Sequence, residues 1–429
     1  MRIPMRFTRL WRSLSLLSLF LYFIVFLFTG KLDPKVPYRY LIRPRAGRTA
    51  HGEASSGIIL CLFEGAMEMG VSLIRELRCL GNKEIIQVHH CMNELSTRSQ
   101  QLLRSIDDHI QIIDICEQAQ RQNMFPKGVR PSDFQGYWIK PLALILTNLT
   151  QVVLMDADDV FLQDPASLRR LSGYTKTGTT FFYDRHVKLH NFLARRINGT
   201  PLLRHLISTF DYAQFGLQGP NPSEHLKRSL TYRYNVAHEQ DSSLVLIDKS
   251  RAGKAMKILE YLIFHVRYEL RFSWGDKEAY WLAFELAQQD YFFSPWGLSL
   301  LDSVPNGCLK KHPNTLCGSM AHFVPYELDT EPSQVLYVNG KALLEPHPAG
   351  RSPTAKVKLS RMYNPNPTHI TPRFRRLNVD LAKQKSFECM DGLGSERLPQ
   401  VFQAYLLRRR LHFLALSMDY LPSLNICQL

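Results

Sequence analysis

A little more than a third of the way along the chain an apolar run turns abruptly acidic, in the sequence Val152-Val153-Leu154-Met155-Asp156-Ala157-Asp158-Asp159-Val160. The apolar half, residues 152–155, has the length and composition of a short buried strand. In open α/β sheets, ligands bind beyond the carboxyl ends of the strands, which is where Asp156 and Asp158 stand. Carboxylates separated by one residue can point to the same side and share a hard cation such as Mg²⁺ or Mn²⁺. We therefore predict a divalent-metal site at Asp156 and Asp158.

Short apolar runs alternate with helical periodicity on both sides of this sequence. Strands are predicted at residues 58–62, 85–88, 110–115, 152–155, 179–183 and 243–248. Helices are predicted at residues 71–80, 94–106, 138–146, 252–268, 277–289 and 398–418. Such alternation is typical of a Rossmann-like α/β fold, with a mostly parallel sheet and helices on both faces.

The chain as a whole is basic, but its charge is unevenly distributed. The 429 residues carry a formal charge of +15, and residues 1–50 contribute +9 while residues 346–385 contribute +8. Residues 51–345 carry 30 basic and 32 acidic side chains, a net charge of −2. A nucleic-acid-binding domain needs a basic surface on its folded body, so this distribution argues against nucleic acid as a partner.

Residues 13–30 contain no charged side chain, and twelve of these eighteen are Leu, Ile, Val or Phe. This length and composition predict a single membrane-spanning helix. Arginines in residues 1–12 precede the helix, so the positive-inside rule places the amino end in the cytosol and the rest in the lumen. Because no small-residue cleavage site follows, the pattern favours an uncleaved signal anchor over a cleaved signal peptide.

The chain is accordingly expected to have five parts. These are a cytosolic tail at 1–12, the anchor at 13–30, a stem at 31–56, a catalytic domain at 57–345 and a basic C-terminal extension at 346–429. The Arg408-Arg409-Arg410 cluster in the extension is typical of a solvated helix face.

Eight cysteines can pair in an oxidising lumen, and the sequence has no Cys-x-x-Cys motif. Cys308 and Cys317 are close enough in sequence to close a small loop. Cys61 and Cys79 lie in apolar runs, which is typical of buried free thiols.

Two chemistries use an acidic pair at the end of a strand. The sequence Asp156-x-Asp158-x-Val160 matches the signature of haloacid-dehalogenase-like phosphatases, in which the first Asp is a nucleophile. That family places its motif on an early strand and needs a late acidic pair, whose spacing residues 275–278 do not reproduce. The other chemistry is glycosyl transfer from a sugar nucleotide, in which a cation neutralises the leaving diphosphate.

Downstream motifs favour glycosyl transfer. Over residues 57–345 the chain resembles the fungal Golgi α-1,3-mannosyltransferases of glycosyltransferase family 71. The resemblance rests on an ordered set of motifs: Trp138-x-Lys140-Pro141, Asp156-Ala157-Asp158, Thr177-Gly178-Thr179, Asp184-Arg185, Glu239-Gln240-Asp241-Ser242, Asp248-Lys249 and Gly275-Asp276-Lys277-Glu278. Each motif is weak by itself, and the specificity comes from their order.

This resemblance implies a type II Golgi membrane enzyme with a GT-A fold. It implies a retaining, metal-dependent α-mannosyltransferase that uses GDP-mannose and Mn²⁺ (or Mg²⁺) and transfers mannose, through an α-1,3 or α-1,2 linkage, to mannose-containing N- or O-linked glycans of glycoproteins. The implied site residues are Asp156, Asp158 and His322 at the metal, Asp156, Asp158, Lys140 and Lys341 at the nucleotide, and Glu239 and Asp241 as catalytic groups on the acceptor side.

Other interpretations stay open at the level of sequence. A plain structural role also fits His322, Glu239 and Asp241, and Asp276 is placed to cap a helix. Asp159 and Asp164 are expected to be loop or capping residues. The alternatives for function are a GT-A enzyme that uses a UDP-sugar, a membrane-anchored haloacid-dehalogenase-like phosphatase, and a non-catalytic scaffold that binds mannan.

Overall fold

The computed structural model describes residues 55–185, 190–234, 236–303, 314–344, 366–376, 389–417 and 427. The expected cytosolic tail, the anchor at 13–30 and nearly all of the stem lie outside these residues. Within the described part of the chain, no helix is both long and apolar enough to span a membrane. Ala54–Leu429 forms one compact unit.

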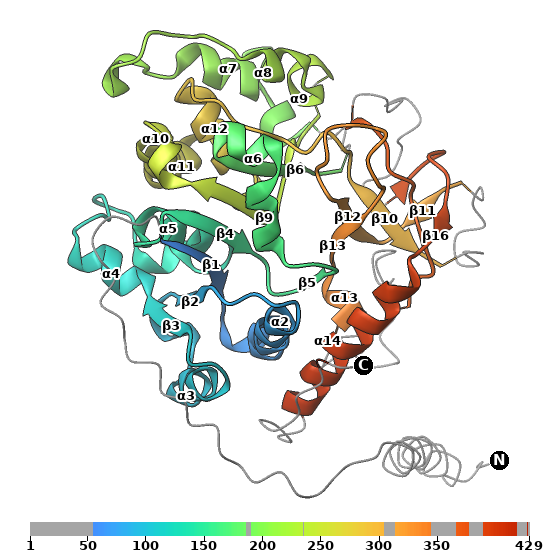
Figure 1. Ribbon diagram of the computed structural model, residues 1–429. Coiled ribbons are helices and arrows are strands. Elements are labelled where there is room, and N and C mark those ends of the chain that lie inside the picture. The colour runs from blue at the N-terminus through green and yellow to red at the C-terminus, as the bar shows by residue number, and fades with distance from the viewer. Residues whose placement is uncertain are drawn as a thin grey trace, which may run out of the picture. The chain divides into compact units, whose positions relative to one another are not determined.

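The central element is a six-stranded sheet with the order β3-β2-β1-β4-β9-β6 (Figure 1). Its strands are β1 Ser56–Cys61, β2 Ile85–His90, β3 Ile110–Asp114, β4 Gln151–Met155, β6 Thr179–Tyr183 and β9 Gln240–Asp248. The pairings of β1 with β2 and β4, and of β2 with β3, are parallel, whereas β9 runs antiparallel to β4 and β6. The predicted mixed α/β fold with a mostly parallel sheet is therefore confirmed.

Helices cover both faces of this sheet, because successive strand residues point to opposite sides. Ile59, Val152 and Leu154 belong to one apolar core, and Ile58 and Val153 belong to the other. The first core is completed by α4 Ile115–Arg121, α5 Ile139–Leu146, α10 Ala255–Tyr261 and α12 Ala279–Leu286. The second is completed by α2 Met67–Cys79, α3 Thr97–Ile106 and α14 Gln400–Ser417.

A second sheet, entirely antiparallel in its pairings, was not predicted. Its order is β16-β14-β10-β12-β13-β5. The strands are β5 Asp159–Phe161, β10 Ser299–Asp302, β12 Ser319–Phe323, β13 Val335–Asn339, β14 His369–Ile370 and β16 Glu396–Arg397. They are two to five residues long and pair across large sequence separations, so local periodicity carries little signal for them. Asp156-Ala157-Asp158 is the link through which the chain passes from the first sheet, at β4, to the second, at β5.

The expected boundary after residue 345 does not separate two packed units. The predicted helix at 398–418 is confirmed as α14, but it packs against α2 in the same compact unit (Figure 1). The expectation that Arg408-Arg409-Arg410 forms a solvated face was wrong, because Arg408 is 7% exposed and Arg409 is 0% exposed. Successive helix positions are about 100° apart, so the three guanidinium groups point toward different neighbours.

The described part of the chain contains three disulfides, one of which joins residues 348 positions apart. Cys79 pairs with Cys427, so the prediction of a free Cys79 was wrong. Cys317 pairs with Cys389, its register partner between β11 Leu316–Cys317 and β15 Cys389–Met390, rather than with Cys308, which lies outside the described residues. Among the described cysteines Cys61 is unpaired, as predicted.

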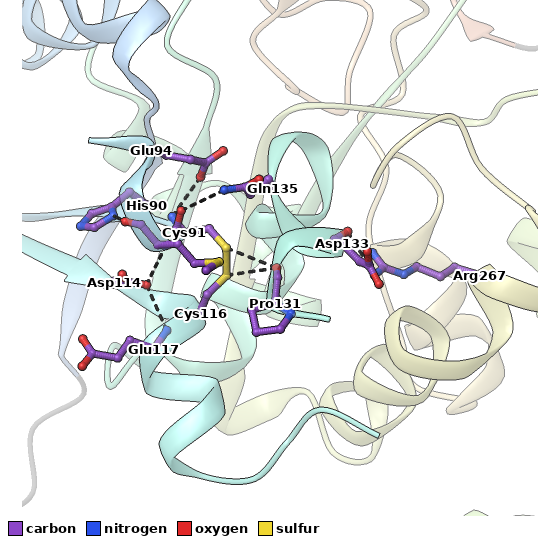
Figure 2. Close-up of a disulfide and its surroundings, with 11 residues drawn as sticks. His90, Cys91, Glu94, Asp114, Cys116, Glu117, Pro131, Asp133, Gln135 and Arg267 are labelled. Atoms are coloured by element: carbon purple, nitrogen blue, oxygen red, sulfur yellow. Dashed lines mark hydrogen bonds between the residues drawn. A yellow bond between two sulfur atoms is a disulfide. The ribbon is translucent and has the colours of Figure 1, made fainter. Parts of the chain in front are cut away.

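The third disulfide, Cys91–Cys116, joins the end of β2 to the first turn of α4 (Figure 2). Hydrogen bonds surround it: the Cys91 N–H donates to Glu94 at 2.9 Å, and the Gln135 side chain donates to the Cys91 carbonyl at 3.4 Å. Gln135 immediately precedes the short helical turns that lead into α5. The disulfide therefore helps to fix the entry to the helix that carries Lys140.

Candidate active site

Three strand ends meet at one edge of the first sheet. Because β9 runs antiparallel to β4 and β6, its amino end lies beside the carboxyl ends of both strands. The Asp156 N–H donates to the Ser243 carbonyl at 2.8 Å, and the Asp184 N–H donates to the Glu239 carbonyl at 2.9 Å. Polar residues that are more than 50 positions apart in sequence are brought together in this way.

A cleft of about 570 Å³ opens at this edge. Its lining carries charges of both signs, from Lys140, Asp156, Asp184, Asp241, Asp276 and Lys277. These six residues come from five motifs of the ordered set that indicated glycosyl transfer. The fold thus gathers into one cleft the motifs that the sequence spreads over residues 140–277.

Lys140 is the centre of one charged group. It lies in the first turn of α5, and its Nζ donates to Asp156 at 2.8 Å and to the Ser242 carbonyl at 2.7 Å. Asp276 lies 3.2 Å from the same Nζ. Burial by itself would lower the pKa of Lys140, but Asp156 and Asp276 together raise it, so the ammonium group stays charged.

Asp156 faces the cleft with 35% of its side chain exposed. Desolvation in the cleft raises its pKa to about 7, against the opposing effect of Lys140, and the neighbouring carboxylates of Asp158 and Asp276 add to the rise. Asp276 also accepts a hydrogen bond from the Tyr280 hydroxyl at 2.7 Å. The sequence suggested only a helix cap for Asp276, whereas the structure places it among the charged residues of the cleft.

Asp158 and Asp159 share a partner on the second sheet. The Asn339 side-chain amide donates to Asp158 at 3.1 Å and to Asp159 at 2.9 Å. The expectation of a loop or capping role for Asp159 was wrong, because it begins β5 and is fully buried there. Asp164 does cap a helical turn, accepting from the Ala166 N–H at 3.0 Å, as predicted.

A second charged group consists of Asp184, Lys277 and Asp241. Lys277 Nζ lies 2.6 Å from the Asp184 carboxylate, and this cation holds the pKa of Asp184 well below its usual range despite burial. The ordered motifs contained both residues, but no role could be assigned to them from sequence. Their pairing depends on the loop before α12 meeting the end of β6, which is a tertiary contact.

Asp241 faces the cleft and is held from behind. Its Oδ2 accepts from the Ser243 hydroxyl and from His322 Nε2, both at 2.8 Å. His322 lies in β12 with its ring stacked on Tyr337 at a centroid distance of 4.9 Å. Although desolvation opposes it, the hydrogen bond from His322 lowers the pKa of Asp241, so this carboxylate is ionised at neutral pH.

The predicted metal set of Asp156, Asp158 and His322 is not brought together. His322 turns its Nε2 to Asp241, and the described residues contain no group of three or more His, Cys, Asp or Glu side chains arranged to hold a metal ion. The strand that carries His322 points its ring into the core, which the sequence around it did not reveal. Asp156 and Asp158 remain as two neighbouring carboxylates. Asp156 pairs with the cation of Lys140, and Asp158 accepts from the neutral Asn339 amide.

Two further predicted residues lie away from the cleft lining. The buried Glu239 carboxylate accepts from the Thr231 N–H at 3.2 Å and lies 4.0 Å from Arg376 Nη2, which is a structural arrangement. Lys341 is exposed at the start of α13 Lys341–Leu344 and does not line the cleft. Asn339, two residues earlier, lines it instead.

A divalent cation fits the donor set at Asp156 and Asp158. Both groups are oxygen donors of the kind that Mn²⁺ and Mg²⁺ prefer, and such ions usually take only one or two carboxylates and complete their shell with water or phosphate oxygens. Burial raises the pKa values of both carboxylates, and repulsion from Asp158 adds to the rise at Asp156. A bound cation would relieve that repulsion. The residues present therefore fit a two-carboxylate site.

Among curated proteins, the chain is similar to fungal mannosyltransferases. It is 28% identical to "Putative alpha-1,3-mannosyltransferase MNN1" of Candida albicans, over 55% of this chain and 32% of that protein. It is 23% identical to "Alpha-1,3-mannosyltransferase MNN1" of Saccharomyces cerevisiae, over 67% of this chain and 41% of that protein. The aligned part thus spans only about a third to two fifths of the length of these two relatives.

Among solved structures, one similar chain is core-mannan synthase A (CmsA/Ktr4) from Aspergillus fumigatus in its Mn/GDP form, at 11% identity and a TM-score of 0.38 over 61% of this chain and 81% of that one. Residues 55–323 match the family described as "Mannosyltransferase putative". This match covers the first sheet, the motifs that line the cleft and every residue of its lining except Asn339, and the chain belongs to this mannosyltransferase family.

Proposed function

We propose that the chain is a metal-dependent, retaining α-mannosyltransferase that transfers mannose from GDP-mannose to mannose-containing glycans. The observation that carries this proposal is the single cleft in which Lys140, Asp156 and Asp276 lie beside Asp184, Asp241 and Lys277, in a chain of a mannosyltransferase family. The anchor predicted at residues 13–30 would hold the enzyme in the Golgi membrane with its cleft in the lumen.

Each charged group has a part in this reaction. Asp156 and Asp158 would hold Mn²⁺ or Mg²⁺, which supplies neutralisation of the departing diphosphate. Lys140 holds Asp156 in place and adds a positive charge at the same end of the cleft. Asp241 presents an ionised carboxylate that can orient the acceptor hydroxyl or stabilise positive charge at the anomeric carbon. Ser243 and His322 fix the direction of that carboxylate.

The decisive experiment compares sugar donors with the full-length chain purified in detergent. We expect Mn²⁺-dependent transfer from GDP-mannose to an α-mannoside, and none from UDP-glucose, UDP-galactose or UDP-N-acetylglucosamine. Asp158→Ala should lower kcat/KM by roughly 10²- to 10³-fold, because it removes a group that binds the charge of the leaving diphosphate. Asp164→Asn is the matched control, since Asp164 caps a nearby turn outside the cleft.

Other outcomes would replace the proposal. Turnover of a UDP-sugar would keep the glycosyltransferase and change the donor. Release of phosphate from p-nitrophenyl phosphate would favour the phosphatase alternative. Mannan binding by the unchanged chain without transfer from any donor, retained after Asp156 and Asp158 are both changed to Ala, would favour the scaffold.

Aromatic side chains at the mouth of the cleft suggest where the acceptor binds. Tyr137 is 61% exposed and Trp274 is 56% exposed, and both line the cleft together with Phe192. Phe192 packs edge-on against Trp274 at a centroid distance of 5.7 Å. Exposed rings at a polar cleft offer flat apolar surface to a sugar ring.

We therefore expect Trp274→Ala to raise the KM for the α-mannoside by about 10-fold, the effect of losing one to two kcal/mol of ring contact. The dissociation constant of GDP, measured by calorimetry, should stay unchanged. Leu328→Ala is the control, because Leu328 is 62% exposed and is not among the residues that line the cleft. Weaker GDP binding with an unchanged acceptor KM would instead assign the aromatic rim to the guanine base.

A further inference from the structure

The C-terminal helix α14 brings a buried cation to the back of the acidic link between the two sheets. Arg409 Nη2 donates to the carbonyls of Ala157 at 2.9 Å and Asp159 at 3.0 Å. Its Nη1 donates to the carbonyl of Met69, in α2, at 3.1 Å. One guanidinium group therefore bonds the residues on both sides of Asp158 and ties them to α2.

Arg409 is itself held firmly. The Ser72 hydroxyl of α2 donates to the Arg409 carbonyl at 2.6 Å. The neighbouring Arg408 forms an ion pair with the buried Glu76, also in α2, with Nε 2.7 Å from the carboxylate. Backbone and side-chain contacts on adjacent residues thus fix α14 against α2, and the Arg409 side chain extends from this base to the link.

The buried positive charge of Arg409 lies where it can offset the negative charge of the acidic link. Burying a guanidinium group is costly unless its surroundings compensate for the lost water. Arg409 is fully buried, and its described hydrogen bonds go to carbonyl oxygens. The link in front of it carries Asp156 and Asp158 and leads directly into Asp159 at the start of β5. A nearby positive charge offsets the mutual repulsion of these three carboxylates. An apolar side chain of the same size would fill the space but would neither bond the two carbonyls nor offset the repulsion.

We propose that Arg409 is a positioning residue, which holds Asp156-Ala157-Asp158-Asp159 in the conformation that binds a divalent cation and a nucleoside diphosphate. What the link binds rests on the proposed function, whereas the positioning of the link rests on the contacts of Arg409. Arg409 also lies outside the residues 55–323 that match the family, so a part of the chain beyond that match would support its metal site.

The test uses the full-length chain and three neighbouring arginines of one helix. Arg409→Gln removes the charge and part of the bonding, while Arg409→Lys keeps the charge and can still bond one carbonyl. Arg410→Gln is the surface-side control, because Arg410 donates to the Leu343 carbonyl and to Asn366 rather than to the link. Arg408→Gln is the stability control, because it breaks the ion pair with Glu76 and has no described contact with the link.

Two measurements separate positioning from folding. Hydrogen exchange of the metal-free protein should be about 10-fold faster or more at residues 157–160 in Arg409→Gln, since bonds from a charged donor to two carbonyls are lost. Calorimetry with Mn²⁺ and GDP should show affinity lowered by about 10-fold or more in the same variant. Arg409→Lys should fall between Arg409→Gln and the unchanged protein, and Arg410→Gln should stay within about twofold in both measurements.

Each result decides a stated question. Unchanged exchange at residues 157–160 in Arg409→Gln, or equal loosening of the link in Arg408→Gln, would overturn the positioning role. If exchange in Arg409→Gln is also faster in the core strand at residues 56–61, the exchange rates at residues 157–160 are compared between Arg409→Lys and Arg408→Gln. Exchange there that is as fast in Arg408→Gln as in Arg409→Lys would overturn the positioning role. Failure of the unchanged protein to bind Mn²⁺ and GDP would overturn the proposed function, and the exchange data would still decide the role of Arg409.

Discussion

The acidic link is supported by two regions of the molecule that are built in different ways. Residues 55–155 form β1 to β4 in parallel pairings, with a helix between each strand and the next, and β4 leads directly into the link. The C-terminal segment reaches the same link across a sequence separation of 252 residues, through Arg409. This segment is attached to α2 by side chains, through the ion pair of Arg408 with Glu76 and the disulfide Cys79–Cys427. In this protein, local alternation builds the sheet, while distant polar contacts complete the site.

The strongest test of this comparison is to break the ion pair of the C-terminal region. Arg408→Leu should lower the free energy of unfolding by about 3–5 kcal/mol, because it leaves the buried Glu76 carboxylate without its partner. Urea unfolding measures the change. The double variant Glu76→Leu, Arg408→Leu should recover most of the loss, since replacing both charges leaves no unpaired group. If the single variant unfolds like the unchanged protein, α14 contributes little to the stability of this region.

The two disulfides anchored at Cys79 and Cys91 sharpen the comparison. Cys79–Cys427 spans 348 residues and attaches the C-terminal region, whereas Cys91–Cys116 spans 25 residues within the first region. Replacing both Cys79 and Cys427 of the long disulfide by Ser should lower the free energy of unfolding by roughly 2–5 kcal/mol. For the short disulfide, Cys91–Cys116, loop-closure entropy predicts a loss of unfolding free energy that is about 2 kcal/mol smaller. Equal losses for the two double variants would show that chain entropy does not set the contribution of the long disulfide.

The pH dependence of stability compares one buried histidine from each region. Burial lowers the pKa of His89, in β2, to about 3, and that of His412, in α14, to about 4. Between pH 6.5 and about 4 the unfolded chain binds protons at these rings that the folded chain does not, so stability falls as the pH is lowered through this range.

Each ring contributes up to about 1.4 kcal/mol per pH unit within that window. Unfolding in urea at a series of pH values measures the slope, and His412→Asn or His89→Asn should each reduce it. A slope that neither substitution changes would mean that both rings are already accessible to protons in the folded state.

The sequence by itself determined most of the first region. The apolar runs at residues 58–62, 85–88, 110–115 and 152–155 predicted strands that the structure contains. The inner strands are buried on both faces and must be apolar along most of their length, whereas the edge strand β3 is only partly buried. The same reasoning placed Asp156 and Asp158 at a strand end, and the ordered motifs indicated the family. The strands and the acidic pair are local features, so a short window of sequence carries them, whereas the order of the motifs is read only over residues 138–278.

Only the tertiary structure decided which side chains meet. Three examples are the ion pair of Asp184 with Lys277, the hydrogen bond from His322 to Asp241 and the approach of Arg376 to Glu239. Each joins elements that are far apart in sequence. The second sheet and the burial of Arg409 have the same origin. Charged side chains carry no periodic signal of burial, because the partner that compensates each charge lies elsewhere in the chain and is known only once the chain has folded.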